Sequence, residues 1–280
     1  MTILEAIILG VIEGITEFLP ISSTAHLTIA QKLLGYTINE PSITAFTAII
    51  QIGAIAAAVV YFWPDIRRVA TAWLAGLSDK TKRVEQDYKF GWAIIIGTIP
   101  AAVLGLLFSD VIETTLRSMW WLAGGLIVWS FVLLYADRRS KGERKESSAT
   151  WKDMLIIGAV QCVAFIPGVS RSGATMSAGL LSGFDRVTAT RFSFFLGIPV
   201  LVAGGIYQAV KHSDAISADG GVGWLPTIVA IIVSFGVAYV TIAWLLKFIS
   251  SHNFSSFVWY RIALGSGIIL LLVSGVITSV

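Results

Sequence analysis

The sequence predicts an all-α polytopic membrane protein with two interrupted helices that resemble each other. Hydrophobic residues make up 56% of its 280 positions and the mean hydropathy is +0.81, far above the values of soluble domains. Several apolar runs are long enough to cross a bilayer as helices. We therefore expect one integral membrane domain over residues 1–280, with about six transmembrane helices and two re-entrant broken helices.

The first broken helix begins at the N-terminus. We expect a helix over residues 3–19 that places Glu13 and Glu17, four residues apart, on one face. Pro20 disfavours the helical conformation in the residue before it and interrupts this helix. Two acids in an apolar chain indicate a functional site, because ionisable groups inside a membrane are costly. The alternative is that they only pair with basic residues within the helix bundle.

Hydroxyl residues follow this interruption. Any of them can cap a second helix that begins near Ala25, and we expect His26 one turn into that helix. The unpaired N–H groups at the start of such a helix suit an anion such as phosphate. The hydroxyl residues are Ser22, Ser23 and Thr24.

The rest of the chain supplies the expected membrane spans and the loops between them. Two polar loops hold more than half of the twenty Lys and Arg residues, which places these loops in the cytoplasm and both termini outside. The same scheme puts Arg186, Arg191, Lys247 and Arg261 at cytoplasmic ends of spans. The first of these loops follows residue 63, and the expected spans are 43–63, 90–108, about 118–136, 190–210, 224–247 and 257–278.

The two halves of the chain resemble each other. Residues 8–24 match residues 156–172, so we expect repeats at about 1–137 and 152–280, joined by a basic cytoplasmic loop at 138–151. Each repeat has one broken helix and three spans, an odd number, so the second half enters the bilayer in the opposite orientation. In such inverted repeats, paired interruptions mark the binding site at the repeat interface.

The second interruption carries an arginine. Arg171 is the sole charged residue between Met154 and Phe184. Its planar fork of donors matches the oxygens of a phosphate. The alternative is that it only neutralises Glu13 or Glu17. The polar residues around it that we expect to bind phosphate are Ser170, Ser172 and Thr175.

Together these residue types fit phosphoryl transfer. Glu13 and Glu17 can hold a hard divalent cation, Mg²⁺ or Ca²⁺. A serine can act as a nucleophile if a nearby base accepts its proton. Arg171 can stabilise charge on a transferring phosphoryl group. The residues alone do not separate such an enzyme from an anion transporter.

Two motifs carry a family resemblance. Glu-Gly-Ile-Thr-Glu-Phe-Leu-Pro-Ile-Ser-Ser-Thr-Ala-His at 13–26 and Pro-Gly-Val-Ser-Arg-Ser-Gly-Ala-Thr at 167–175 closely resemble the bacterial undecaprenyl pyrophosphate phosphatase family of the BacA type. The resemblance covers essentially the whole chain. It implies a bacterial inner-membrane enzyme that hydrolyses undecaprenyl pyrophosphate to undecaprenyl phosphate and inorganic phosphate. This reaction recycles the lipid carrier of cell-wall synthesis and confers bacitracin resistance.

The resemblance also implies roles for single residues. The acidic motif of the family maps onto Glu13 and Glu17, its candidate nucleophile onto Ser23, its histidine onto His26 and its phosphate-binding arginine onto Arg171. It implies a divalent cation and a site that faces the periplasm. The family usually has glycine before the histidine, where this chain has Ala25. Alanine is strained if that position needs a positive φ, but fits the first turn of a helix, which is what we expect.

The expected mechanism leaves some alternatives open. Ser23 attacks the terminal phosphorus while Glu17 or His26 takes its proton, or Ser23 only positions the substrate for attack by water. Ser22 and Thr24 add hydrogen bonds to the phosphate. The expected partners are the polyprenyl pyrophosphate lipid and the bilayer, with no nucleic acid; a homodimer is an open alternative. The rival function is a transporter or flippase of a lipid phosphate or another anion, which uses the same inverted-repeat site.

Overall fold

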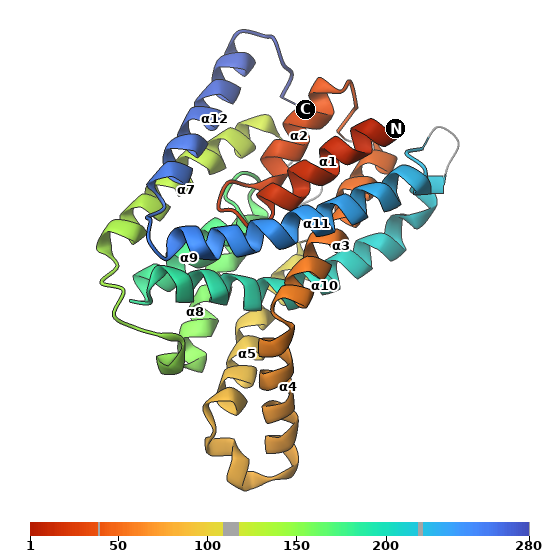
Figure 1. Ribbon diagram of the computed structural model, residues 1–280. Helices are drawn as coiled ribbons and strands as arrows, with labels where there is room; N and C mark the ends of the chain where they lie inside the picture. The colour runs from red at the N-terminus through yellow and green to blue at the C-terminus, as the bar shows by residue number, and fades with distance from the viewer. Residues whose placement is uncertain (39, 109–117, 218–220, 280) are drawn as a thin grey trace.

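The computed structural model describes residues 1–280 except 39, 109–117, 218–220 and 280. Within this part the chain is helical and has no strand beyond one isolated bridge, between Arg144 and Phe184. The 3₁₀ segments include η1 (Lys80–Val84), η2 (Glu146–Ser148) and η3 (Cys162–Phe165). The α-helices (Figure 1) are α1 (Ile3–Thr16), α2 (Ser23–Leu33), α3 (Pro41–Tyr61), α4 (Trp63–Ser78), α5 (Gln86–Leu107), α7 (Met119–Arg139), α8 (Trp151–Gln161), α9 (Arg171–Leu181), α10 (Arg186–Ser217), α11 (Trp224–Ile249) and α12 (Ser255–Val273).

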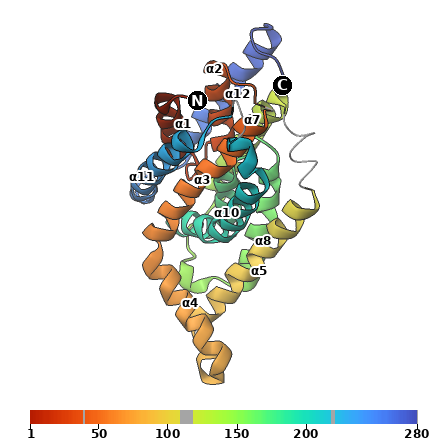
Figure 2. The same cartoon turned by 90° about the vertical axis from the view of Figure 1, so that its right-hand side faces the viewer.

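Six of the described helices are long and apolar enough to cross a membrane: α3, α5, α7, α10, α11 and α12. Their positions agree with the six spans expected from the sequence, to within a few residues at most ends. α10 passes between α3 on one side and α5 and α8 on the other (Figure 2). The prediction of an all-α polytopic membrane protein is therefore confirmed.

The segment after residue 63 differs from the sequence-based prediction. We expected a polar loop, but α4 is a helix that packs along α5, and the two project from one end of the molecule (Figures 1 and 2). Ile66, Val69 and Trp73 share one side of α4 at helical spacing. Arg68 forms ion pairs with Asp65 and Asp87. Arg67 and Arg68 thus lie on the polar side of an amphipathic helix, and further basic residues of the predicted loop lie in η1. Both chain ends lie at the opposite end of the molecule.

The two broken helices have the same local structure. α1 and α8 both begin with a capping box, in which the hydroxyls of Thr2 and Thr150 accept a hydrogen bond from the third residue of the helix. α2 and α9 are both 11 residues long, and their N-caps, Ser22 and Ser170, have φ values of 73° and 72°. The proposed repeat boundaries and the opposite orientation of the halves in the bilayer stay predictions.

The first helix ends earlier than predicted, at Thr16 instead of residue 19, and α2 begins at Ser23. We call residues 17–22 the first break and residues 162–170, between α8 and α9, the second break. Ala25 is buried in the first turn of α2, and its N–H donates to Ser22 Oγ over 3.4 Å. The positive φ falls on Ser22, so alanine fits at position 25 as expected.

Candidate active site

A small pocket of about 140 Å³ lies where the two breaks meet. Its walls come from both halves of the chain, although the breaks are far apart in sequence. Most of the residues that the sequence marks as functional lie here. Gln51 of α3 also lines it. The lining residues are Glu17, Ser22, Ser23, Thr24, Gln51, Ala164, Pro167, Gly168, Ser170, Arg171 and Leu201.

One carboxylate connects the two breaks. Glu17 Oε2 accepts a hydrogen bond from Ser23 Oγ over 2.7 Å. Glu17 Oε1 accepts from Arg171 Nη2 over 3.0 Å, and both side chains of this ion pair are largely buried. The arginine thereby fixes the orientation of the carboxylate that faces the serine hydroxyl. A base that contacts a hydroxyl and is itself held by a third group is the arrangement that activates a serine nucleophile.

Arg171 has a donor left for a ligand. Its Nη1 donates to the carbonyl of Ser193 over 3.0 Å, while Nε has no hydrogen-bond partner in the described part of the chain. Its guanidinium carbon lies 5.7 Å from the centre of the Phe18 ring. A buried N–H without a partner is uncommon in folded proteins. Because Arg171 lines the pocket, its guanidinium is placed to bind an anion there.

Gly197 on α10 makes the space that Arg171 occupies. A Cβ at this position would lie 2.2 Å from Arg171 Nη1. The end of a long side chain can move away, so we expect Gly197→Ala to fold normally but to displace the guanidinium from Glu17. Activity at this site should fall up to about 100-fold, because misplacement of a reacting group by about an ångström is costly. Thermal unfolding in detergent should stay within about 2 °C of the wild type, since helical alanine costs nothing by itself.

A loss of stability in Gly197→Ala that parallels the loss of activity would contradict this reading of the glycine. Gly204→Ala is a suitable control. Gly204 lies seven residues further along α10, and a Cβ at this position meets no atom within 4 Å. This variant should behave as the wild type in both measurements.

His26 lies beside the pocket and is occupied on both ring nitrogens. Nδ1 is 2.8 Å from the carbonyl oxygen of Ser22 and Nε2 is 2.6 Å from the hydroxyl of Tyr260, whose ring stacks on the imidazole. A carbonyl only accepts hydrogen bonds, so Nδ1 carries a proton, and Nε2 is engaged by the Tyr260 hydroxyl. His26 does not line the pocket. Of the two bases expected for Ser23, the geometry therefore favours Glu17.

Two of the serines cap helices at the pocket wall. Ser22 Oγ and Ser170 Oγ accept hydrogen bonds from the N–H groups of Ala25, at 3.4 Å, and Gly173, at 3.2 Å. Thr24 also lines the pocket and its side chain is exposed. These positions surround the N-termini of α2 and α9, where backbone N–H groups and the helix dipole favour an anion.

Ser172 and Thr175 have a different place from the one expected. Ser172 Oγ donates to the carbonyl of Leu19 over 2.9 Å, which links the second half of the site to the first break. Thr175 is fully buried, and its Oγ1 contacts Ser193 Oγ at 2.7 Å and the carbonyl of Arg171 at 2.8 Å. Neither residue lines the pocket. The Thr175 hydroxyl therefore holds the backbone of Arg171, and the Ser172 hydroxyl holds the backbone of the first break.

Glu13 lies one helical turn before Glu17, whose N–H donates to the Glu13 carbonyl over 3.0 Å. Its side chain is completely buried, and neither carboxylate oxygen has a hydrogen-bond partner among the described residues. The described part of the chain has no group of three or more His, Cys, Asp and Glu side chains that could hold a metal. Glu13 does not line the pocket, and its unpaired oxygens are the feature here that suits a hard cation such as Mg²⁺ or Ca²⁺.

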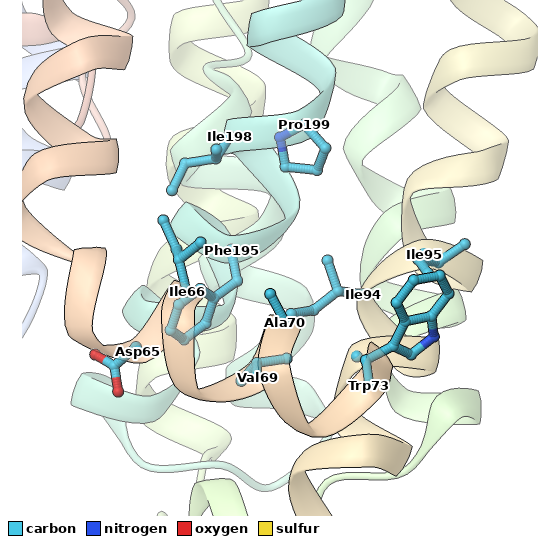
Figure 3. A pocket seen from close by; sticks show the side chains of 11 residues that line it. Asp65, Ile66, Val69, Ala70, Trp73, Ile94, Ile95, Phe195, Ile198 and Pro199 are labelled. Carbon is cyan, nitrogen blue, oxygen red and sulfur yellow. The ribbon is translucent and has the colours of Figure 1, made fainter. Parts of the chain in front are cut away.

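A larger cavity elsewhere in the molecule lacks such groups. It measures about 260 Å³ and lies between α4, α5 and α10, lined by apolar side chains such as Ile66, Ile94 and Phe195 (Figure 3). Asp65 lies at its edge, where the carboxylate pairs with Arg68 at 3.3 Å and Arg191 at 3.1 Å. The cavity offers nothing for phosphoryl transfer, so the smaller polar pocket is the candidate active site.

Two residues of α12 near the site were not recognised from the sequence. Tyr260 holds His26, and Arg261 is completely buried against both breaks. Arg261, which we expected at the end of a span, lies inside α12 and is buried, while the side of the membrane that it faces stays a prediction. Its position inside the apolar α12, six residues after the start at Ser255, was the available signal.

The chain matches a known protein family over most of its length. Residues 6–267 match the family model described as "Bacitracin resistance protein BacA". The chain belongs to the BacA family. Similar BacA-type proteins include "Undecaprenyl-diphosphatase 3" of Frankia casuarinae, 57% identical over 279 residues, and "Undecaprenyl-diphosphatase" of Cutibacterium acnes, 56% identical over 284 residues; each match covers 100% of both chains. "Undecaprenyl-diphosphatase 1" of Streptomyces coelicolor is 48% identical, with 98% of both chains covered.

Proposed function

We propose that this BacA-family membrane protein hydrolyses undecaprenyl pyrophosphate to undecaprenyl phosphate and inorganic phosphate. Relatives that match over essentially the full chain are named undecaprenyl-diphosphatase, which supports this reaction. The observation that carries the assignment to this pocket is the Glu17 carboxylate, which contacts the Ser23 hydroxyl at one oxygen and Arg171 at the other. This arrangement brings together a base, Glu17, a nucleophile, Ser23, and the positive charge of Arg171 that binds the phosphate.

In the proposed first step, Ser23 Oγ gives its proton to Glu17 Oε2 and forms a bond to the terminal phosphorus. The bond between that phosphorus and the bridging oxygen breaks, and undecaprenyl phosphate leaves with the electron pair. Arg171 and the N–H groups at the starts of α2 and α9 bind the equatorial oxygens, where charge develops. Glu17, protonated in the first step, passes its proton on to solvent.

In the second step Glu17 takes a proton from a water molecule, whose oxygen attacks the phosphorus of the phosphoserine. The phosphorus–Oγ bond breaks, Ser23 recovers a proton, and inorganic phosphate is released. The close variant is a direct attack by water, with Ser23 only holding the substrate. The contact of 2.7 Å between Ser23 and Glu17 favours the two-step route, since the hydroxyl already points at its base.

We also propose a divalent cation, Mg²⁺ or Ca²⁺, held by Glu13 and Glu17. When bound, it would neutralise charge on the pyrophosphate. The unused oxygens of buried Glu13 support this role, because an interior carboxylate without hydrogen bonds is stabilised by a cation.

The proposed setting is the bacterial inner membrane, with the site facing the periplasm. There the reaction recycles the lipid carrier of cell-wall synthesis and removes the pyrophosphate that bacitracin binds. Ala164 and Leu201, the apolar residues of the pocket wall, are where we expect the polyprenyl chain to leave sideways into the bilayer. Assembly as a homodimer stays a prediction.

Phosphate release by the purified protein in detergent tests the proposal, because transport has no meaning without a bilayer. We expect undecaprenyl pyrophosphate to yield phosphate, and EDTA to lower the rate at least about 10-fold, with recovery on adding Mg²⁺ or Ca²⁺. No release under conditions where the substrate still binds would favour the transporter or flippase. If EDTA leaves the rate of phosphate release unchanged, the proposed cation is wrong, while the proposed reaction still stands.

A further inference from the structure

The geometry points to Arg261 as a positioning residue that holds the two breaks in register for the reaction. Arg261 lies on α12, is completely buried and does not line the pocket. It therefore acts through the residues of the breaks and does not touch the substrate. This inference rests on the proposed function, since it assigns Arg261 a part in that same reaction.

The guanidinium of Arg261 contacts both breaks at once. Nη1 donates to the carbonyl of Pro20 in the first break over 2.9 Å. Nη2 donates to the carbonyls of Gly168 and Val169 in the second break, over 3.0 Å each. One planar group thus spans the interface between the two halves of the chain. Its fixed fork sets the separation of the two backbones.

The contacts fall at the same position in each break. Pro20 lies two residues before Ser22, and Gly168 lies two residues before Ser170. Both serines have a positive φ, a conformation that non-glycine residues adopt only when the surroundings hold them there. The next residues along the chain are Ser23 and Arg171. Fixing the carbonyls of Pro20 and Gly168 therefore fixes the two groups that meet at Glu17.

The groups around Arg261 are neutral hydrogen-bond acceptors, as expected for a side chain that bridges two backbone segments and does not form an ion pair. In the described ranges of the chain, no carboxylate lies within ion-pair distance of its guanidinium. Nε donates to Ser130 Oγ over 2.9 Å, and Nη2 also approaches two carbonyls of α7, Gly125 and Leu126, at 3.3 Å each. The donors are all directed at neutral oxygens. Only a group with several donors in fixed directions can satisfy them together.

Arg261→Lys tests this inference, because lysine keeps the positive charge but has a single ammonium that cannot reach both breaks. With undecaprenyl pyrophosphate in detergent we expect kcat to fall about 100-fold, since the reacting groups lose their alignment. KM should change less than about 3-fold, because Arg171 and the helix N-termini still bind the phosphate. Amide hydrogen exchange should become faster in the peptides of both breaks.

The matched control is Ser130→Ala. It removes a neutral acceptor of Arg261 on α7 and leaves the contacts to Pro20 and Gly168 in place. Its kcat should stay within about 3-fold of the wild type, and the exchange rates of both breaks should be unchanged. Elution in size-exclusion chromatography and thermal unfolding report whether each variant is folded.

Several outcomes would overturn the inference. One is an Arg261→Lys protein with kcat within about 3-fold of the wild type. Another is exchange that becomes faster throughout the molecule, or in one break only, which would indicate a general or one-sided structural role. If the wild-type protein releases no phosphate, the proposed function fails, while the exchange measurement still decides whether Arg261 holds both breaks.

Discussion

Ser23→Ala is expected to lower phosphate release from undecaprenyl pyrophosphate at least about 1,000-fold, because it removes the atom that attacks the phosphorus. The Ser23 hydroxyl contacts Glu17 at 2.7 Å, and no other described hydroxyl donates to that carboxylate. Substrate binding should change little, since Arg171 and the N-termini of α2 and α9 remain. The measurement is kcat and KM of the purified variant in detergent.

The control for this variant is Ser177→Ala. Ser177 is a buried serine of α9 whose Oγ donates to the carbonyl of Gly173 over 2.7 Å, away from the pocket. Its loss should leave kcat within about 3-fold of the wild type. Retention of more than about a tenth of the activity by Ser23→Ala would exclude Ser23 as the nucleophile.

Arg171→Ala is expected to lower kcat by a similar factor, at least about 1,000-fold, as removal of an arginine that stabilises a transferring phosphoryl group commonly does. Two effects combine in this variant. The transition state loses a cation, and Glu17 loses the 3.0 Å ion pair that orients it toward Ser23. Arg171→Lys should recover only part of the rate, because an ammonium cannot contact Glu17, Ser193 and a phosphate oxygen together.

Lys247→Ala is the matched cationic control, since Lys247 is an exposed residue near the end of α11 and outside the pocket. It should retain the wild-type kcat. Similar losses in Lys247→Ala and Arg171→Ala would mean that net charge, and not the fork at the pocket, governs the rate.

The sequence predicts much of the fold because its signals are local. Long apolar runs gave the spans to within a few residues at most ends, and Pro20 with the hydroxyls after it gave the first break. The end of α1 at Thr16 was missed, because the turn before the proline is set by packing as well as by its ring. α4 was missed because its basic residues hid the helical spacing of Ile66, Val69 and Trp73.

The sequence predicted which residues form the pocket better than it predicted which of their side chains contact one another. The sequence marked Glu17, Ser23 and Arg171, and the structure brings them together. It did not show that Thr175 faces into the protein, since helix direction inside a bundle depends on neighbours far along the chain. Arg261 was expected at the end of a span, because the rule for cytoplasmic ends applies to a lone positive charge in an apolar run. The sequence does not distinguish such a charge from an arginine that is buried and bridges two segments.

The stereochemical course at the terminal phosphorus tests most directly whether Ser23 forms a bond to it. The substrate would be undecaprenyl pyrophosphate made chiral at that phosphorus with oxygen isotopes and sulfur, hydrolysed by the wild-type protein in isotopically labelled water. Two successive in-line displacements, first by Ser23 and then by water, predict retention of configuration. Inversion would show a single displacement by water and would contradict the phosphoserine intermediate.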